Sequence, residues 1–220
     1  MLYSKLCEIY ELLRKSPSRL KKTEILTEFL NELKKEKNKE IVYLLQGRVW
    51  PDYIEKEFGI SGQLTIKALS KASGLAEEKV IFKFKKIGDL GEVAAEIMKS
   101  KKQSTLFSSK LTTEKVIENL KKLPELEGKG AVDKKIGLIS ELLTSAESLE
   151  AKYITRTLLN DLRIGVGSGV IRDAITWSCL DKDNKEDFEL VQSSYDTLTD
   201  FKLVFEKAVL GKKELENIQL

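Results

Sequence analysis

The sequence contains no histidine and little cysteine, proline or aromatic material. Its 220 residues include two cysteines, three prolines and 7% aromatic residues. Without histidine, Ser-His-Asp catalysis, Cys-His catalysis and histidine-ligated zinc are all excluded. Two separated cysteines, Cys7 and Cys179, cannot form a thiolate metal site, and we interpret both as small core residues rather than a disulfide or a nucleophile. Carboxylates, lysines and backbone amides remain available for chemistry.

Long hydrophobic runs are also absent. No apolar stretch approaches the roughly 18 residues of a membrane helix, and the N-terminal MLYSKLCEIYELLRKS carries charges every few residues, unlike a signal peptide. We therefore expect a soluble, cytoplasmic protein without a membrane partner. The net charge of +3 does not by itself indicate a nucleic-acid partner, so the distribution of the basic residues must decide.

The residues that are abundant favour helices. Hydrophobic residues make up 41% of the chain and charged residues 33%, which is enough apolar material for a core. Apolar stripes at helical spacing predict an all-α fold, a single domain over residues 1–220 with roughly ten or more helices in two pseudo-related lobes. Within it we expect a helix opened by Thr23, helix caps at Ser61 and at Thr112 or Thr113, a third helix ending near Gly47, a strongly amphipathic helix over 148–165, a polar basic loop over 99–113 and one or two closing helices.

Three glycine turns stand next to basic residues. Gly88 follows Lys85 and Lys86, Gly130 lies among Lys129, Lys134 and Lys135, and Gly165 to Gly169 lie between Arg163 and Arg172. A helix start exposes up to four unpaired N–H groups and about half a positive charge, so glycines there allow a phosphate close to the backbone. The alternative is that each glycine ends a helix and the basic residues are solvated. A true internal duplication of the turns is a further open possibility.

Other ligand sites have weaker signals. GVGSGV matches the dinucleotide motif G-x-G-x-x-G only loosely, follows a helix rather than a strand, and no P-loop motif occurs. The adjacent Glu77 and Glu78 diverge on a helix. The acidic run Asp181, Asp183, Glu186 and Asp187 lacks the glycine and terminal glutamate of an EF-hand. We therefore expect no catalytic carboxylate pair and no metal site.

Four segments together resemble a known family. They are YLLQGRVWPDY at 43–53, GDLGEVA at 88–94, LEAKYITRTLLNDLRIGVGSGVIRDAI at 149–175 and YDTLTDF at 195–201. Their order and spacing closely resemble the N-terminal DNA-binding domain of ATP-dependent DNA ligases, in particular archaeal replicative ones, over nearly the whole chain. The resemblance implies an all-helical domain that encircles nicked duplex DNA together with two catalytic domains. Such a domain holds the minor-groove face through the DNA backbone, without reading sequence.

The resemblance also implies which residues contact phosphates. The first candidates are Arg163, Gly165, Gly167, Ser168, Gly169 and Arg172; the second are Lys129, Gly130, Lys134 and Lys135; the third are Gly88, Asp89 and Gly91. Several helix starts aimed at successive phosphates would hold a duplex by its shape, which suits an enzyme that seals any nick.

The catalytic motif of these ligases is missing. They carry an adenylated lysine in K-x-D-G, and this chain has no Asp-Gly dipeptide. We therefore expect a monomeric fragment without catalytic residues or a cofactor of its own, unable to join DNA ends alone. By resemblance, its partners are nicked duplex DNA and the nucleotidyltransferase and OB-fold domains of the full-length enzyme. That enzyme would use ATP and Mg²⁺ in DNA replication, repair and recombination.

The basic loop contains a second motif of the family. QSTLF at 103–107 resembles a shortened clamp-binding motif, in which Gln103, Leu106 and Phe107 would enter a pocket on the sliding clamp PCNA. Alternatively, Leu106 and Phe107 pack under their own loop. The alternative function is that of a helical protein-interaction scaffold that binds only the clamp. A DNA affinity that depends only weakly on salt would favour this scaffold over a protein that binds the DNA backbone.

Overall fold

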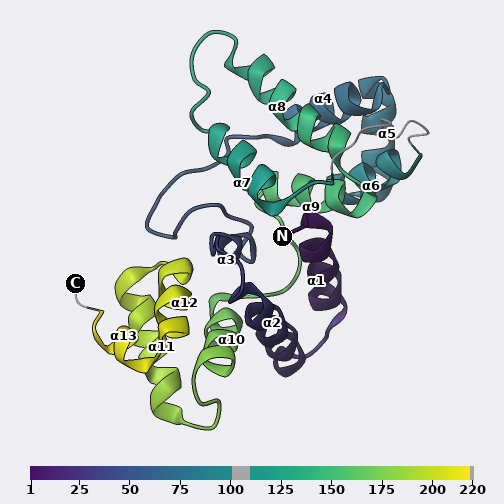
Figure 1. Ribbon diagram of the computed structural model, residues 1–220. Coiled ribbons are helices and arrows are strands. Elements are labelled where there is room, and N and C mark those ends of the chain that lie inside the picture. The colour runs from purple at the N-terminus through teal and green to yellow at the C-terminus, as the bar shows by residue number, and fades with distance from the viewer. Residues whose placement is uncertain (101–109, 219–220) are drawn as a thin grey trace. The chain divides into compact units, whose positions relative to one another are not determined.

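The computed structural model describes residues 1–100 and 110–218, and it confirms the all-α prediction. Helices make up 68% of the structure, and the described residues form 13 helices and no strand (Figure 1). The helices are α1 (Tyr3–Lys15), α2 (Arg19–Leu33), α3 (Ile41–Leu44), α4 (Gly62–Ser73), α5 (Glu77–Ile87), α6 (Leu90–Ser100), α7 (Thr113–Lys122), α8 (Ala131–Ser145), α9 (Ser148–Leu158), α10 (Ser168–Cys179), α11 (Lys185–Leu198), α12 (Phe201–Leu210) and α13 (Lys212–Glu216). None of the helices in the described ranges is long and apolar enough to cross a membrane.

Two predicted helix caps are confirmed. The Ser61 hydroxyl accepts a hydrogen bond from the backbone N–H of Leu64 at 3.2 Å, and the Thr112 hydroxyl accepts one from Lys115 at the same distance. Each bond satisfies one of the N–H groups that a helix start leaves without an internal partner. Both boundaries were therefore encoded locally.

The predicted helix start at Thr23 is wrong. α2 begins at Arg19, where the hydroxyl of Ser18 accepts from the N–H of Lys21 at 3.2 Å. Thr23 lies inside the helix, and its hydroxyl donates to the carbonyl of Arg19. The serine after Pro17 supplies the cap several residues before the expected position, so the basic residues that follow it belong to the helix.

The chain divides into two compact units, each made from two separate sequence segments. The first unit comprises residues 1–8 and 56–162, and the second comprises residues 9–55 and 163–220. α1 contributes residues to both. That the two units are related by duplication stays a prediction. The two glycine turns that would correspond differ in length, since two residues separate α5 from α6 and nine separate α9 from α10.

The core of the first unit is built mainly where α6 packs on α9 and α4 packs on α8. α9 is buried along its whole length from Glu150 to Leu158, including Lys152 and Arg156. The prediction of an amphipathic helix over 148–165 is therefore wrong in two respects, because the helix ends at Leu158 and has no solvent face. Ion pairs with α6 make the burial of its two basic residues tolerable.

The core of the second unit forms around α2, α3, α10, α11 and α12. Its largest fully buried side chains include Phe29, Phe201 and Phe205. The one or two closing helices expected over 185–211 are confirmed as two, α11 and α12, with Asp200 as the cap of α12. The short α13 follows after Gly211. The third helix is shorter than predicted, since α3 ends at Leu44.

Both cysteines are free thiols. Cys7 is fully buried and agrees with the core interpretation, whereas Cys179 is only partly buried and lies beside the hydroxyl of Ser178. Burial raises the pKa of the Cys179 thiol, which keeps it in the unreactive protonated form near neutral pH.

Candidate nucleic-acid interface

The glycine-rich segment of the second unit leads directly into α10, as predicted. Arg163 and Gly165 adopt positive φ angles of +54° and +64°, and Gly167 is the extended N-cap residue with φ −101° and ψ 172°. No atom lies within 4 Å of the position that a Cβ on Gly167 would take. The N–H of Val170 donates to the carbonyl of Gly167 at 3.0 Å. Because glycine brings no capping side chain and the first turn has no acidic residue, no side chain of the helix start competes with an external anion for the N–H groups of Ser168 and Gly169.

Basic side chains from α2 surround this helix start. α2 packs beside α10 in the second unit (Figure 1). Lys22 Nζ donates to the carbonyls of Ile164 and Gly165 at 3.1 and 2.7 Å. Arg19 Nη2 lies 3.2 Å from the position of a Cβ on Gly169, so a larger residue there would displace it. The arrangement gathers positive charge where the helix dipole is also positive.

Sequence reasoning missed Arg19 and Lys22. They stand more than 140 positions from the glycines that they approach, and they precede Thr23, where the helix was expected to begin. The available signal was Ser18 followed by basic residues, which marks a helix with positive charge in its first turn. Their partner on α10 could not be inferred from that signal.

The two arginines here differ in exposure. Arg19 Nη2 contacts Asp173 Oδ2 at 2.6 Å while its side chain stays 66% exposed. Arg172 is only 21% exposed: its Nη1 lies 3.8 Å from Oδ1 of the exposed Asp196, and its guanidinium lies over the Tyr195 ring at 5.5 Å. An exposed pair contributes about 0–1 kcal/mol, so a phosphate can compete for Arg19.

The start of α8 in the first unit has a similar but weaker character. Gly130 is its N-cap residue with φ +81°, and the preceding Gly128 also has a positive φ, of +77°. Lys129 and Lys134 are exposed. Lys135 Nζ instead lies 3.3 Å from the position of a Cβ on Gly59. The first turn also carries Asp133, whose negative charge lowers the attraction for a phosphate.

The start of α6 already holds a carboxylate of the chain. Gly88 ends α5 with φ +78°, and Asp89 Oδ1 then accepts from the N–H groups of Gly91 and Glu92 at 2.7 and 3.1 Å. The other oxygen of Asp89 binds Arg156 Nη2 at 2.8 Å. The N–H groups that a phosphate would use are thus occupied by a side chain of the chain.

Gly91 has a role inside the fold. It is buried, and a Cβ there would lie 2.8 Å from Arg156 Cγ and 3.0 Å from its Nε. Glycine is therefore what allows Arg156 to lie across the first turn of α6, where it also reaches Glu92 at 3.3 Å. Lys152 completes this buried cluster with a 2.8 Å contact to the same glutamate. Gly91 thus meets a packing requirement.

Comparison with known proteins decides the family. The family described as "DNA ligase N terminus" matches residues 2–176, which include all three glycine turns. The chain belongs to this family.

Archaeal DNA ligases are similar to this DNA ligase N-terminal chain over most of its length. The protein named "DNA ligase" from Methanosphaera stadtmanae is 45% identical over 177 residues, which cover 79% of the chain and 32% of that protein. Those from Thermococcus fumicolans and Methanocaldococcus jannaschii are 37% and 36% identical, cover 100% of the chain, and are themselves covered to 39% and 38%. The chain thus spans about a third of the length of these relatives, and the resemblance drawn from the four segments is confirmed.

Two of the segments that carry this family's pattern meet in the second unit. Asp52 accepts hydrogen bonds from Gln46 at 3.1 Å, from Arg48 at 2.9 Å and from the hydroxyl of Tyr195. We call these four residues the Asp52 cluster. Burial, together with the hydrogen bond to Asp52, raises the pKa of Tyr195 to about 12. The Arg172 guanidinium lies over the Tyr195 ring, so the cluster connects the segments at 43–53 and 195–201 to Arg172 of α10.

The acidic residues considered in the sequence form no metal-type cluster in the described part of the chain. No group of three or more His, Cys, Asp or Glu side chains suited to a metal ion occurs in the described residues. Asp187, in the acidic run, instead binds Lys212 Nζ at 2.7 Å and accepts from the N–H of Asp181 at 3.0 Å. The clamp-binding candidates Gln103, Leu106 and Phe107 lie outside the described residues.

Proposed function

We propose that this chain binds duplex DNA through its phosphate backbone without sequence preference, and that it positions nicked DNA for a longer ATP-dependent DNA ligase. The observation that carries the proposal is the start of α10. There, a helix start with no side-chain cap and no acidic residue in its first turn is bordered by Arg19, Lys22 and Arg172, and Arg163 precedes it in the chain. N–H groups and guanidinium groups bind phosphate oxygens, which are the same in every DNA sequence.

The three glycine turns contribute unequally in this proposal. The start of α10 is the principal phosphate site, because no side chain caps it and Arg19 beside it is 66% exposed. The start of α8 is the second, with Lys129 and Lys134 exposed beside Gly130 but Asp133 in the first turn. The start of α6 ranks last, since Asp89 would have to leave its N–H groups before a phosphate could enter.

The chemistry of ligation belongs, in this proposal, to the rest of the longer enzyme. This chain holds no Asp-Gly dipeptide and therefore no K-x-D-G lysine. ATP and Mg²⁺ would act in the other domains, and this chain would supply DNA affinity and orientation during replication and repair. Attachment to the sliding clamp PCNA through Gln103, Leu106 and Phe107 is the second part of the proposal, carried by the QSTLF sequence.

The test compares Gly167→Glu with Gly167→Gln. The site of a Cβ on Gly167 is open and its φ is negative, so both side chains fit, and they differ only in charge. We expect Gly167→Glu to bind a labelled nicked duplex about tenfold more weakly than Gly167→Gln, which corresponds to about 1.4 kcal/mol. The parent affinity should fall steeply with salt, with a logarithmic slope of about −0.9 for each phosphate neutralised.

Measurement by fluorescence anisotropy over a salt series, with circular dichroism to check folding, separates the outcomes. Equal affinities of the two variants would exclude the start of α10 as a phosphate site. A weak and shallow salt dependence in the parent would remove the proposed function itself and favour a scaffold that binds proteins only.

A further inference from the structure

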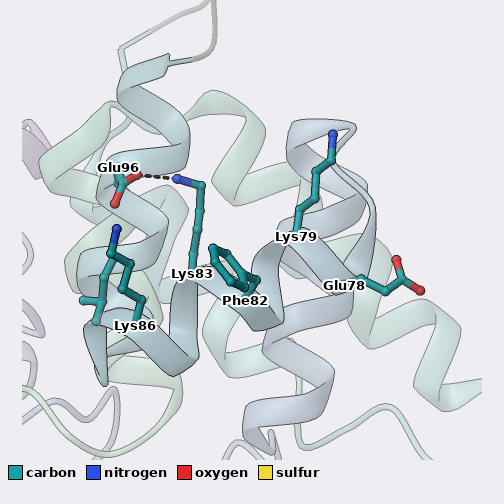
Figure 2. A pocket seen from close by; sticks show the side chains of 7 residues that line it. Glu78, Lys79, Phe82, Lys83, Lys86 and Glu96 are labelled. Carbon is teal, nitrogen blue, oxygen red and sulfur yellow. Dashed lines mark hydrogen bonds and ion pairs between the residues drawn. The ribbon is translucent and has the colours of Figure 1, made fainter.

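A groove of about 630 Å³ lies in the first unit along one side of α5, with α6 at its edge. Its apolar floor is formed by Phe82 and Ile87, and Lys79, Lys83 and Lys86 stand around it (Figure 2). The DNA-binding proposal does not use any of these residues. The groove therefore needs its own explanation.

The groove follows from the spacing of residues on α5. Val80 is fully buried and fixes the inward face of the helix. Phe82 and Lys86 are four residues apart, as are Lys79 and Lys83, so the two pairs form neighbouring rows on the outward face. Phe82 is consequently 69% exposed and Ile87 37% exposed. An exposed phenyl ring in a hollow, framed by lysines, is typical of a binding surface.

The charges around the groove leave it basic at both ends. Lys83 pairs with Glu96 of α6, so this lysine is neutralised within the fold. Lys79 and Lys86 lie on opposite sides of the Phe82 ring, and the carboxylate of Glu78 is turned away from that ring (Figure 2). Lys79 and Lys86 are both exposed, so a ligand can reach their ammonium groups.

We propose that this groove docks an acidic segment of a partner protein that carries one bulky apolar side chain. The apolar side chain would lie against Phe82 and Ile87, where it leaves water. Lys79 and Lys86 are seven residues apart, or about 10 Å along the helix axis. An extended segment covers that distance in about three residues, so two acidic residues about three positions apart, with the apolar residue between them, match the groove.

Duplex DNA fits this surface less well. Its phosphates gain nothing from the phenyl ring, which is the apolar part of the lining. A peptide with both apolar and acidic side chains uses both parts of the lining.

The experiment measures binding of a fluorescein-labelled synthetic peptide with the core Asp-Phe-Ser-Glu to the whole chain. Two control peptides carry alanine in place of phenylalanine, or lysine in place of both acids. Phe82→Ser and the double variant Lys79→Glu, Lys86→Glu should each weaken binding of the acidic peptide by about tenfold or more. Leu210→Ser is the matched control, since Leu210 is 70% exposed and belongs to the second unit, and it should leave binding unchanged.

Several outcomes would overturn the proposal. Binding that Phe82→Ser does not change, or equal binding of the lysine peptide, would exclude this occupant. A loss of nicked-duplex affinity in Phe82→Ser as large as that in Gly167→Glu would assign the groove to DNA. Self-association in sedimentation experiments that Phe82→Ser abolishes would assign it to a second copy of the chain. Failure of the DNA-binding proposal would leave all peptide results unchanged, so the two ideas fail separately.

Discussion

The starts of α6 and α10 look alike in sequence, but they differ in whether a side chain of the protein already binds their N–H groups. Both follow a turn that contains glycine, and both have a basic residue nearby. At α6 the carboxylate of Asp89 accepts hydrogen bonds from the N–H groups of the first turn, and an ion pair with Arg156 neutralises that carboxylate. At α10 Gly167 supplies no side chain, and the neighbouring Arg19 remains exposed. A glycine before a helix is therefore an anion site only where the chain supplies no anion of its own.

The largest expected effect in this comparison concerns the two arginines. Arg156→Met removes the ion pairs that this buried guanidinium makes with Asp89, whose side chain is 11% exposed, and with Glu92, and we expect the free energy of unfolding to fall by about 3–5 kcal/mol. The counterpart Arg172→Met removes a pair with the exposed Asp196 and should cost about 1 kcal/mol or less. Urea denaturation of both variants measures the difference. Equal losses would show that the start of α6 is not the closed site described here.

The two glycines should differ next most strongly. Gly91→Ala forces Arg156 to move, because the added Cβ would lie 2.8 Å from its Cγ, and a loss of about 1–3 kcal/mol is expected. Gly167→Ala meets no atom within 4 Å, and its loss should be limited to about 0.5–1 kcal/mol, because alanine is a poorer N-cap residue than glycine. Thermal unfolding of the pair provides the check. A Gly91→Ala protein as stable as the parent would remove the packing explanation for this glycine.

The smallest expected effect concerns Tyr195, whose ring lies beneath the guanidinium of Arg172 in α10. Its pKa is about 12 in the fold against 10.0 for a solvated tyrosine side chain, so the folded state holds the phenolic proton more tightly. The stability that this proton contributes is complete below pH 10 and is lost as the pH rises toward 12. Tyr195→Phe should therefore show a shallower loss of stability than the parent over that interval, measured by urea denaturation at several pH values. Parallel pH profiles would contradict the assignment.

Much of the local structure of this chain was predictable because its causes are local. The apolar spacing predicted an all-α fold, and the hydroxyls of Ser61 and Thr112 marked helix starts that the structure confirms. The Thr23 prediction failed where a nearer cap, Ser18, competed with it. The solvent face expected for α9 failed because ion pairs with α6 allow charged residues to be buried there.

In the candidate site, too, features with local causes were predictable and contacts between distant segments were not. The glycines, the basic residues beside them and the helix starts that follow lie within a few positions of one another, so the sequence alone was enough to predict them. Packing between distant segments was needed to bring Arg19 and Lys22 to the start of α10, to join Asp52 to Tyr195, and to close the start of α6 with Asp89 and Arg156. Those contacts join residues from 67 to 154 positions apart, and their formation depends on the packing of whole helices, which local spacing does not specify.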